Sequence, residues 1–249
     1  MIAYHYDLLY GDRDDDLEMW LALTEDISGP ILEVGCGTGR VFVPLLQHEK
    51  RITGIDISQQ ALQIVQEKVT MGGFVEQAQL HQADMRNFAL PEQNFAFAFV
   101  PINTLMHCET TADQINTLRA IHNHLHSDGI LVLDLFNPTP HRLLEADGQL
   151  ILEGQQVDMV TNNTIQWYVS RRLEVDQQLE DVTFILDEIQ EDGILRRGTL
   201  SFSLRYVHRF EAELLLSQTG FELQEIYGDY DLSLYDKHSP RLILVAKKR

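Results

Sequence analysis

The stretch that most constrains the fold of this chain is residues 31–41, which read Ile-Leu-Glu-Val-Gly-Cys-Gly-Thr-Gly-Arg-Val. A short apolar run with one acidic residue leads here into three glycines at alternate positions. The pattern predicts a buried strand that turns sharply into a helix, because glycine adopts positive φ angles without strain and lets a ligand approach the backbone. The start of a helix also offers unpaired N–H groups. The stretch therefore predicts a site for a nucleotide-like cofactor.

Two further predicted strands end in an acidic residue. Residues 51–58 read as a second short strand with Asp56 near its end, and residues 80–85 as a third with Asp84 in the same position. Residues 94–100 predict a fourth strand that is apolar on both faces, as a central strand of a parallel sheet is. The sequence thus places an acidic residue in or at the end of each of the first three strands.

Helices alternate with these strands. The pattern predicts helices over 14–26, 40–48, 59–70, 111–125 and 211–219, and later strands over 130–136, 221–227 and 241–247. Ser58 is placed to cap the helix that follows it. This alternation predicts an α/β fold, a parallel, doubly wound sheet with helices on both faces and right-handed crossovers.

Between residues 150 and 210 the helical periodicity disappears. Three long runs alternate apolar and polar residues, over 164–175, 179–190 and 194–208. Asp192-Gly193 is a strong hairpin-turn signal between the last two. We therefore expect an inserted antiparallel β meander over 150–208, within a domain formed by 1–149 and 209–249.

Composition narrows the set of partners. Acidic residues outnumber basic ones by 38 to 19, and the net charge is -19. Such a surface disfavours nucleic acid and anionic membranes, since both are bound through basic faces. No apolar run approaches the roughly 20 residues of a transmembrane helix, and the N-terminal residues lack the features of a signal peptide. We expect a cytoplasmic protein that binds neither nucleic acid nor membranes.

No metal site is predicted. Cys36 and Cys108 are the only cysteines, too few for a disulfide framework or a cysteine-rich zinc site, and we expect both to be buried. His122, His124 and His126 stand at every second position. On a helix they would face different ways, unlike the i, i+4 pair typical of a metal site.

Together these features resemble the class I S-adenosylmethionine-dependent methyltransferases. The resemblance covers residues 30–136 and 210–249, and it rests on the glycine turn, the acidic strand ends, the Asp-Gly turn before the fifth strand and the paired C-terminal strands. It implies a Rossmann-like sheet of seven strands, mostly parallel, with the last strand antiparallel. A closer similarity is to small-molecule N-methyltransferases that carry a β insertion between strands five and six.

The resemblance implies that S-adenosylmethionine is the cofactor, and it implies roles for the acidic residues. Asp56 would accept hydrogen bonds from both ribose hydroxyls. Asp84 and Met85 would contact the adenine, with Ile57 on its other face, and Glu33 would lie near the methionine ammonium or stabilise the turn. The other predicted cofactor-binding residues are Gly35, Cys36, Gly37, Gly39 and Pro101. Any one acid at a strand end could instead cap the next helix.

The acceptor site is expected beside residues 101–108, where the family keeps its reaction centre. Catalytic candidates are Asn103, which could orient an acceptor, His107, which could take a proton, and Tyr10, in a tyrosine-rich N-terminal arm that could act as a lid. The alternatives are a helix-start asparagine, a surface histidine and an arm that only packs. A neutral amine needs no base to attack a methyl group, whereas a hydroxyl usually does.

The predicted function is methyl transfer to a small molecule, at nitrogen rather than oxygen. One face of the inserted meander could cover the acceptor or join two subunits into a homodimer, and it carries Trp167, Val169, Phe184, Leu186 and Tyr206. A catalytically silent, cofactor-binding relative is one alternative. A nicotinamide-dependent oxidoreductase is another, although Gly35-x-Gly37-x-Gly39 differs from the G-x-G-x-x-G spacing of dinucleotide sites.

Overall fold

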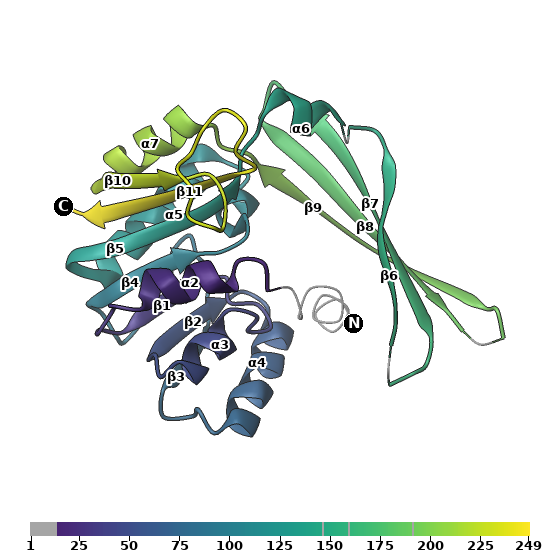
Figure 1. The fold of residues 1–249 in the computed structure, drawn as a ribbon, viewed down its shortest axis with the longest axis horizontal. Helices are drawn as coiled ribbons and strands as arrows, with labels where there is room; N and C mark the ends of the chain where they lie inside the picture. The colour runs from purple at the N-terminus through teal and green to yellow at the C-terminus, as the bar shows by residue number, and fades with distance from the viewer. Residues whose placement is uncertain (1–13, 146, 159, 191) are drawn as a thin grey trace. The chain divides into compact units, whose positions relative to one another are not determined.

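The structure is a computed structural model that describes residues 14–145, 147–158, 160–190 and 192–249 (Figure 1). Contacts between residues divide the chain into two compact units. One runs to Asn137 and resumes over His208–Arg249, and the other is Pro138–Val207. Tyr10, a catalytic candidate, lies outside the described residues. No described helix has the length and hydropathy needed to cross a membrane.

The first unit contains a seven-stranded sheet. Its strands are β1 Ile31–Val34, β2 Ile52–Asp56, β3 Ala78–Gln82, β4 Phe95–Val100, β5 Leu125–Phe136, β10 Phe221–Tyr227 and β11 Arg241–Lys248. They are ordered β10-β11-β5-β4-β1-β2-β3. Strands β1 to β5 pair in parallel, whereas β11 is antiparallel to both of its neighbours. The predicted sheet, with its last strand antiparallel, is confirmed.

Helices cover both faces of this sheet (Figure 1). They are α2 Leu17–Thr24, α3 Phe42–Gln47, α4 Gln59–Gly72, α5 Thr111–His124, α7 Arg209–Gln218 and the 3-10 helix η1 Thr104–His107. α4 begins where predicted because the Ser58 hydroxyl accepts a hydrogen bond from Ala61 N at 3.2 Å. The chain reverses after α7 at Gly220, whose φ is +90°. The third strand ends at Gln82, so Asp84 lies in the turn beyond it rather than on the strand.

Aromatic side chains fill the core between α2 and the sheet. Trp20 is fully buried, and its ring centroid lies 4.6 Å from that of Phe99 on β4. The indole Nε1 donates to Asp16 Oδ2 at 2.9 Å, so the polar end of the tryptophan is satisfied inside the core. This packing fixes the start of α2 against the centre of the parallel sheet.

The second unit is a four-stranded antiparallel sheet with one short helix, α6 Pro140–Glu145. Its strands, in sheet order, are β6 Leu150–Val157, β7 Thr164–Glu174, β8 Leu179–Ile189 and β9 Leu195–Arg205. The sequence predicted three of these strands and missed β6 and α6. β6 escaped prediction because Glu153-Gly154-Gln155-Gln156 interrupts its apolar pattern.

The predicted apolar face of this sheet is partly confirmed. Val169 is buried, while Trp167, Phe184 and Leu186 on the same face are half-buried. Trp167 lies across Gly154 of β6, where a Cβ would come within 2.3 Å of its ring. Tyr206 is buried but follows β9 rather than belonging to it, so its expected place on the strand was wrong.

Two strand glycines provide a matched test of this packing. A Cβ at Gly54 of β2 would lie 2.8 Å from both Cys36 Sγ and Phe42 Cε2, whereas one at Gly198 of β9 would meet nothing within 4 Å. We expect Gly54→Ala to lower the free energy of unfolding by about 1–3 kcal/mol through overpacking. Gly198→Ala should leave it unchanged or raise it by up to about 1 kcal/mol. Urea unfolding checks both, and equal effects would contradict the packing described for β2.

Candidate functional site

The glycine-rich stretch forms the turn that joins β1 to α3. Gly35, Gly37 and Gly39 have φ values of 80°, 52° and 88°, all in the left-handed region. The turn is fastened to β2, because the N–H groups of Gly35 and Cys36 both donate to Ile55 O, at 2.8 and 3.0 Å. The predicted strand-to-helix turn is confirmed.

The three glycines differ in what surrounds them. A Cβ at Gly35 would lie 2.3 Å from Thr104 Cγ2, and one at Gly39 would lie 2.5 Å from Val65 Cγ2. A Cβ at Gly37 would meet nothing within 4 Å. Gly35 and Gly39 are therefore needed for close packing, whereas Gly37 leaves its backbone open to a ligand.

Asp56 connects the end of β2 to this turn. Its Oδ2 accepts a hydrogen bond from Gly37 N at 2.9 Å, and its Oδ1 accepts one from Ser58 N at 2.8 Å. The next residue, Ile57, is apolar yet 66% exposed. A carboxylate with acceptor capacity to spare thus stands beside an exposed apolar side chain, an arrangement suited to a sugar hydroxyl pair and an adjoining base.

Glu33 lies beneath the turn and is almost fully buried. Its Oε2 has no hydrogen-bond partner among the described residues. Burial raises the pKa of this carboxyl well above its usual value, and the nearby Arg40 acts in the opposite direction. A buried acceptor without a partner is costly, so the position suits a ligand that brings a donor, above all a cationic one.

Arg40 was not predicted to belong to the site. Its Nη2 donates to Asp16 Oδ2 at 2.7 Å, and the Asp16 carboxylate is fully buried and also accepts from Trp20. This bidentate ion pair joins Arg40, directly after Gly39, to Asp16, directly before α2. Nothing in the sequence distinguished Asp16 from Asp14 and Asp15, because the pairing depends on how α2 packs.

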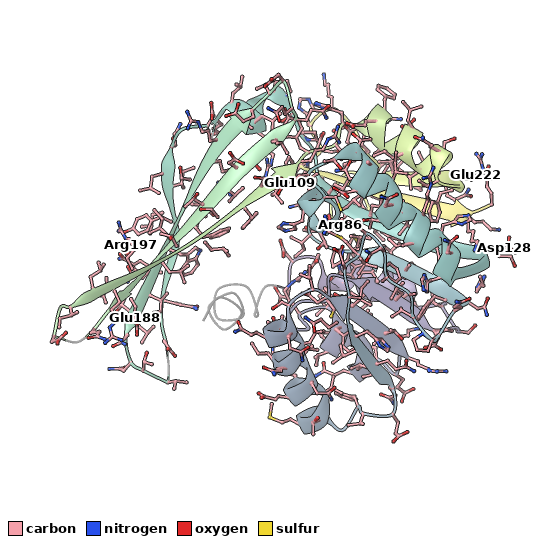
Figure 2. The ribbon with its side chains drawn as sticks, turned by 180° about the vertical axis from the view of Figure 1, so that it is seen from behind. Arg86, Glu109, Asp128, Glu188, Arg197 and Glu222 are labelled. Atoms are coloured by element: carbon pink, nitrogen blue, oxygen red, sulfur yellow. The ribbon has the colours of Figure 1, made fainter. Side chains whose placement is uncertain are left out.

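Asp84 and Met85 follow β3. The end of β2 reaches this turn, since Ala83 N donates to Asp56 O at 3.0 Å. The side chain of Arg86, which Figure 2 labels, donates to both Asp84 oxygens. These hydrogen bonds lower the pKa of Asp84. Asp84 is therefore already paired, and Arg86 is a second residue of this region that the sequence analysis missed.

The segment after β4 approaches the turn from the other side. Pro101 is buried at its start, and Asn103 has a φ of 61°, with its Oδ1 accepting from Phe136 N at 2.6 Å. His107, at the end of η1, retains exposed surface. The protein atoms around its ring still lower the pKa of the imidazole by desolvation, and the Asp56 charge opposes this shift. His107 is thus close enough to the Asp56 carboxylate to experience its field.

The cysteines and the other histidines have structural contacts. Cys36 and Cys108 are buried free thiols, as predicted, and burial raises the pKa of each. His124 Nε2 accepts from Leu90 N at 3.0 Å, and His122 meets the Phe221 ring edge-on. Within the described ranges, no group of three or more His, Cys, Asp or Glu side chains could hold a metal ion.

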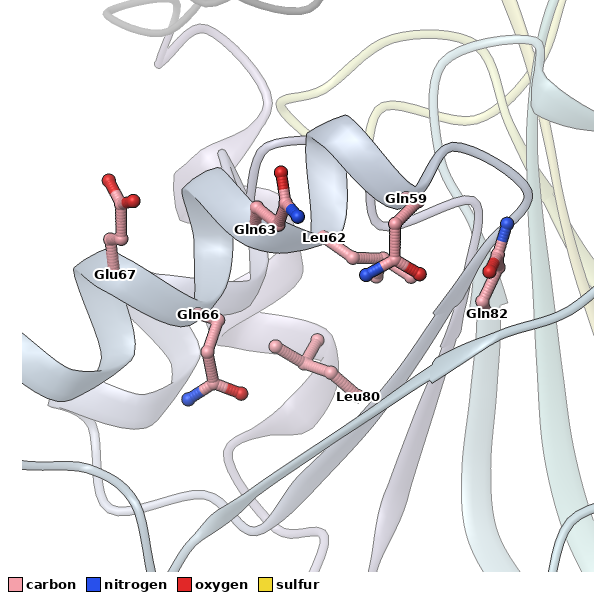
Figure 3. Close-up of a pocket in the computed structure, with 7 residues that line it drawn as sticks. All are labelled: Gln59, Leu62, Gln63, Gln66, Glu67, Leu80 and Gln82. Carbon is pink, nitrogen blue, oxygen red and sulfur yellow. The ribbon is translucent and has the colours of Figure 1, made fainter.

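A hollow runs between α4 and the edge strand β3 (Figure 3). It is lined by Gln59, Leu62, Gln63, Gln66, Glu67, Leu80 and Gln82. None of these is a predicted cofactor-binding residue. Only at Gln82 does the lining reach the predicted site, where its Nε2 donates to Ile57 O at 3.1 Å.

Comparisons with known proteins agree with this geometry. Residues 31–129 match a family described as a methyltransferase domain. YqeM of Bacillus subtilis, named provisionally as a methyltransferase, is 22% identical over 234 residues, which cover 94% of this chain and 90% of the relative.

Two solved structures share the fold. The CcbJ methyltransferase of Streptomyces caelestis superposes with a TM-score of 0.80 at 23% identity, covering 94% of this chain and 89% of that one. The sugar N-methyltransferase KedS8 of a Streptoalloteichus species superposes with a TM-score of 0.77 at 22% identity, covering 98% of this chain and 92% of that one. The chain thus carries a stretch that matches a methyltransferase domain over residues 31–129, and it shares the fold of these solved methyltransferases.

Proposed function

We propose that this methyltransferase methylates a nitrogen atom of a small molecule and holds S-adenosylmethionine through Asp56, Glu33 and the glycine turn. The observation that carries the cofactor part is the Asp56 carboxylate, which is bonded to Gly37 N and Ser58 N on the open side of the turn. When bound, S-adenosylmethionine supplies an electrophilic methyl group on a positively charged sulfur.

The chain's own groups have separate tasks in this proposal. Asp56 accepts hydrogen bonds from the ribose hydroxyls. Glu33 accepts one from the methionine ammonium through Oε2, the oxygen that has no partner among the described residues. Ile57 and Met85 flank the adenine, and Asp84, oriented by Arg86, faces its amino group. The backbone from Gly35 through Cys36 and Gly37 to Gly39, together with Pro101, forms the wall against which the cofactor packs.

The choice of a nitrogen acceptor is supported by a solved protein of the same fold, and His107 is the base that we propose for it. Burial lowers the pKa of His107, which favours the neutral imidazole, and in this proposal the imidazole takes the proton that an ammonium acceptor loses before the amine attacks. KedS8, which shares the fold, is a sugar N-methyltransferase. We propose an amine-bearing sugar as the acceptor class, with Asn103 and Tyr10 as further candidates for orienting it. The net charge of -19 disfavours nucleic acid.

The inserted sheet has a proposed role in the same reaction. Its apolar face, which includes Trp167, Phe184 and Leu186, covers the acceptor or joins a second copy of the chain. Either role would remove half-buried apolar side chains from water, which is favourable.

Asp56→Ala tests the cofactor site. The substitution removes an acceptor of charge-assisted hydrogen bonds, each of which contributes about 1.5–3 kcal/mol. We expect the affinity for S-adenosylhomocysteine, measured by titration calorimetry, to fall about ten- to 150-fold. Asp128→Ala, near the start of β5, is the control and should leave the affinity unchanged. An unaltered affinity of Asp56→Ala would remove Asp56 from the site.

Glu33→Gln tests the buried carboxyl without a ligand. The pKa of Glu33 is higher in the folded protein than in the unfolded chain. As the pH rises above the unfolded pKa, the unfolded chain loses this proton before the folded protein does, so the wild-type protein loses stability. We expect the melting temperatures of the variant and the wild type to be similar at pH 4 and the variant to melt higher at pH 8. Glu222→Gln, at an exposed position, is the matched control. A variant that melts below the wild type at pH 8 would contradict the assignment.

His107→Asn tests the acceptor chemistry. We expect methyl transfer from S-adenosylmethionine to a panel of amino sugars, followed by mass spectrometry, to fall about 10²-fold or more in kcat. The affinity for S-adenosylhomocysteine should stay unchanged, since His107 acts on the acceptor. The same sugars with hydroxyl in place of amino are the control substrates, and methylation of these instead would overturn the nitrogen assignment.

A further inference from the structure

The chain leaves β4 through two consecutive residues in a strained conformation. Ile102 has a φ of 38° and Asn103 a φ of 61°. Positive φ is rare for residues other than glycine and is a genuine outlier for a β-branched side chain such as isoleucine. Such a conformation persists only where the surrounding structure imposes it.

Three hydrogen bonds with the end of β5 hold Ile102 and Asn103 in this conformation. Ile102 N donates to Asp134 Oδ2 at 3.0 Å, and Asn103 N donates to Asp134 O at 2.8 Å. In return Phe136 N donates to Asn103 Oδ1 at 2.6 Å. Asp134 thus fixes both strained residues, one through its side chain and the other through its backbone.

Asp134 is in turn held by β11. The carboxyl is fully buried, and burial raises its pKa, while the neighbouring Arg241 guanidinium acts to lower it. Arg241 donates to Asp134 Oδ1 through Nε at 2.9 Å and also through Nη2. The guanidinium lies over the Tyr230 ring, 5.1 Å from its centroid, and the Tyr230 hydroxyl lies 3.4 Å from Asp134 Oδ2.

The strained turn meets the cofactor turn directly. Thr104 follows Asn103, and its Cγ2 stands where a Cβ on Gly35 would come within 2.3 Å. The two segments are in close contact, because a side chain on Gly35 would overlap Thr104. Thr104 therefore packs directly against Gly35, and this contact joins the 102–103 turn to the glycine turn.

We propose that the Asp134–Arg241 pair is a positioning device for the cofactor site. It holds Ile102 and Asn103 in their strained conformation and, through Thr104, keeps the glycine turn in its binding form before any ligand arrives. This inference rests on the proposed cofactor site. Both residues act through the turn, so they are positioning residues rather than catalytic ones.

The test removes the pair without leaving a buried charge. We expect D134N/R241Q to weaken the binding of S-adenosylhomocysteine at least tenfold in titration calorimetry. Adding Ile102→Gly should restore most of the affinity, because glycine adopts positive φ without strain and needs no device to hold it. A general loss of stability would not be restored in this way, since glycine increases the entropy of the unfolded chain.

The matched control is another ion pair on the same two strands. Lys247 Nζ lies 2.8 Å from Asp128 Oδ1, at the end of the β5–β11 pair away from Asp134. Figure 2 shows Asp128 well apart from Arg86, the residue that pairs with Asp84 after β3. D128N/K247Q should bind S-adenosylhomocysteine with the wild-type affinity.

A second measurement needs no variant. Hydrogen exchange of the unliganded wild-type protein should show the amides of Ile102 and Phe136 protected as strongly as the central amides of β4. Fast exchange of these two amides would overturn the proposal, as would an unchanged affinity of D134N/R241Q or a loss that Ile102→Gly does not restore. If D134N/R241Q does not fold, the exchange result decides. A wild-type chain that fails to bind S-adenosylhomocysteine would instead overturn the proposed cofactor site.

Discussion

One carboxylate, that of Asp56, joins the parts on which this site depends. Its two oxygens accept the N–H groups of Gly37 and Ser58, so the end of β2 fixes both the glycine turn and the start of α4. Hydrogen bonds from N–H groups to a carboxylate are stronger than hydrogen bonds between neutral groups. The bonds that shape the turn are thus made within the chain itself.

Two other carboxylates near this turn, those of Glu33 and Asp16, differ in their hydrogen-bond partners. Glu33 is buried with an unpartnered oxygen and a raised pKa, whereas Asp16 is buried but satisfied by Arg40 and Trp20. The first finds no donor for this oxygen within the part of the chain that the structure describes. The second fastens α2 to the end of the turn. Burial alone thus does not decide the role of an acid here; the presence of a partner does.

The sequence predicted the sheet, because buried parallel strands are apolar runs and the glycines at 35, 37 and 39 admit few other conformations. It also indicated Asp56, which is the last residue of β2. It could not indicate Arg40 with Asp16, or Asp134 with Arg241, since these pairs join residues 24 and 107 positions apart. The strain at Ile102 was equally hidden, because the residue type argues against it. The role of the inserted sheet stays a prediction.

The most direct test of the central claim is a crystal structure of the protein with S-adenosylhomocysteine. The account predicts that both ribose hydroxyls lie within hydrogen-bond distance of the Asp56 carboxylate, that Gly37 N remains bonded to it, and that the ligand ammonium meets Glu33. A ribose bound elsewhere, for instance in the hollow beside α4, or an Asp56 carboxylate that turns away from the ligand, would contradict it.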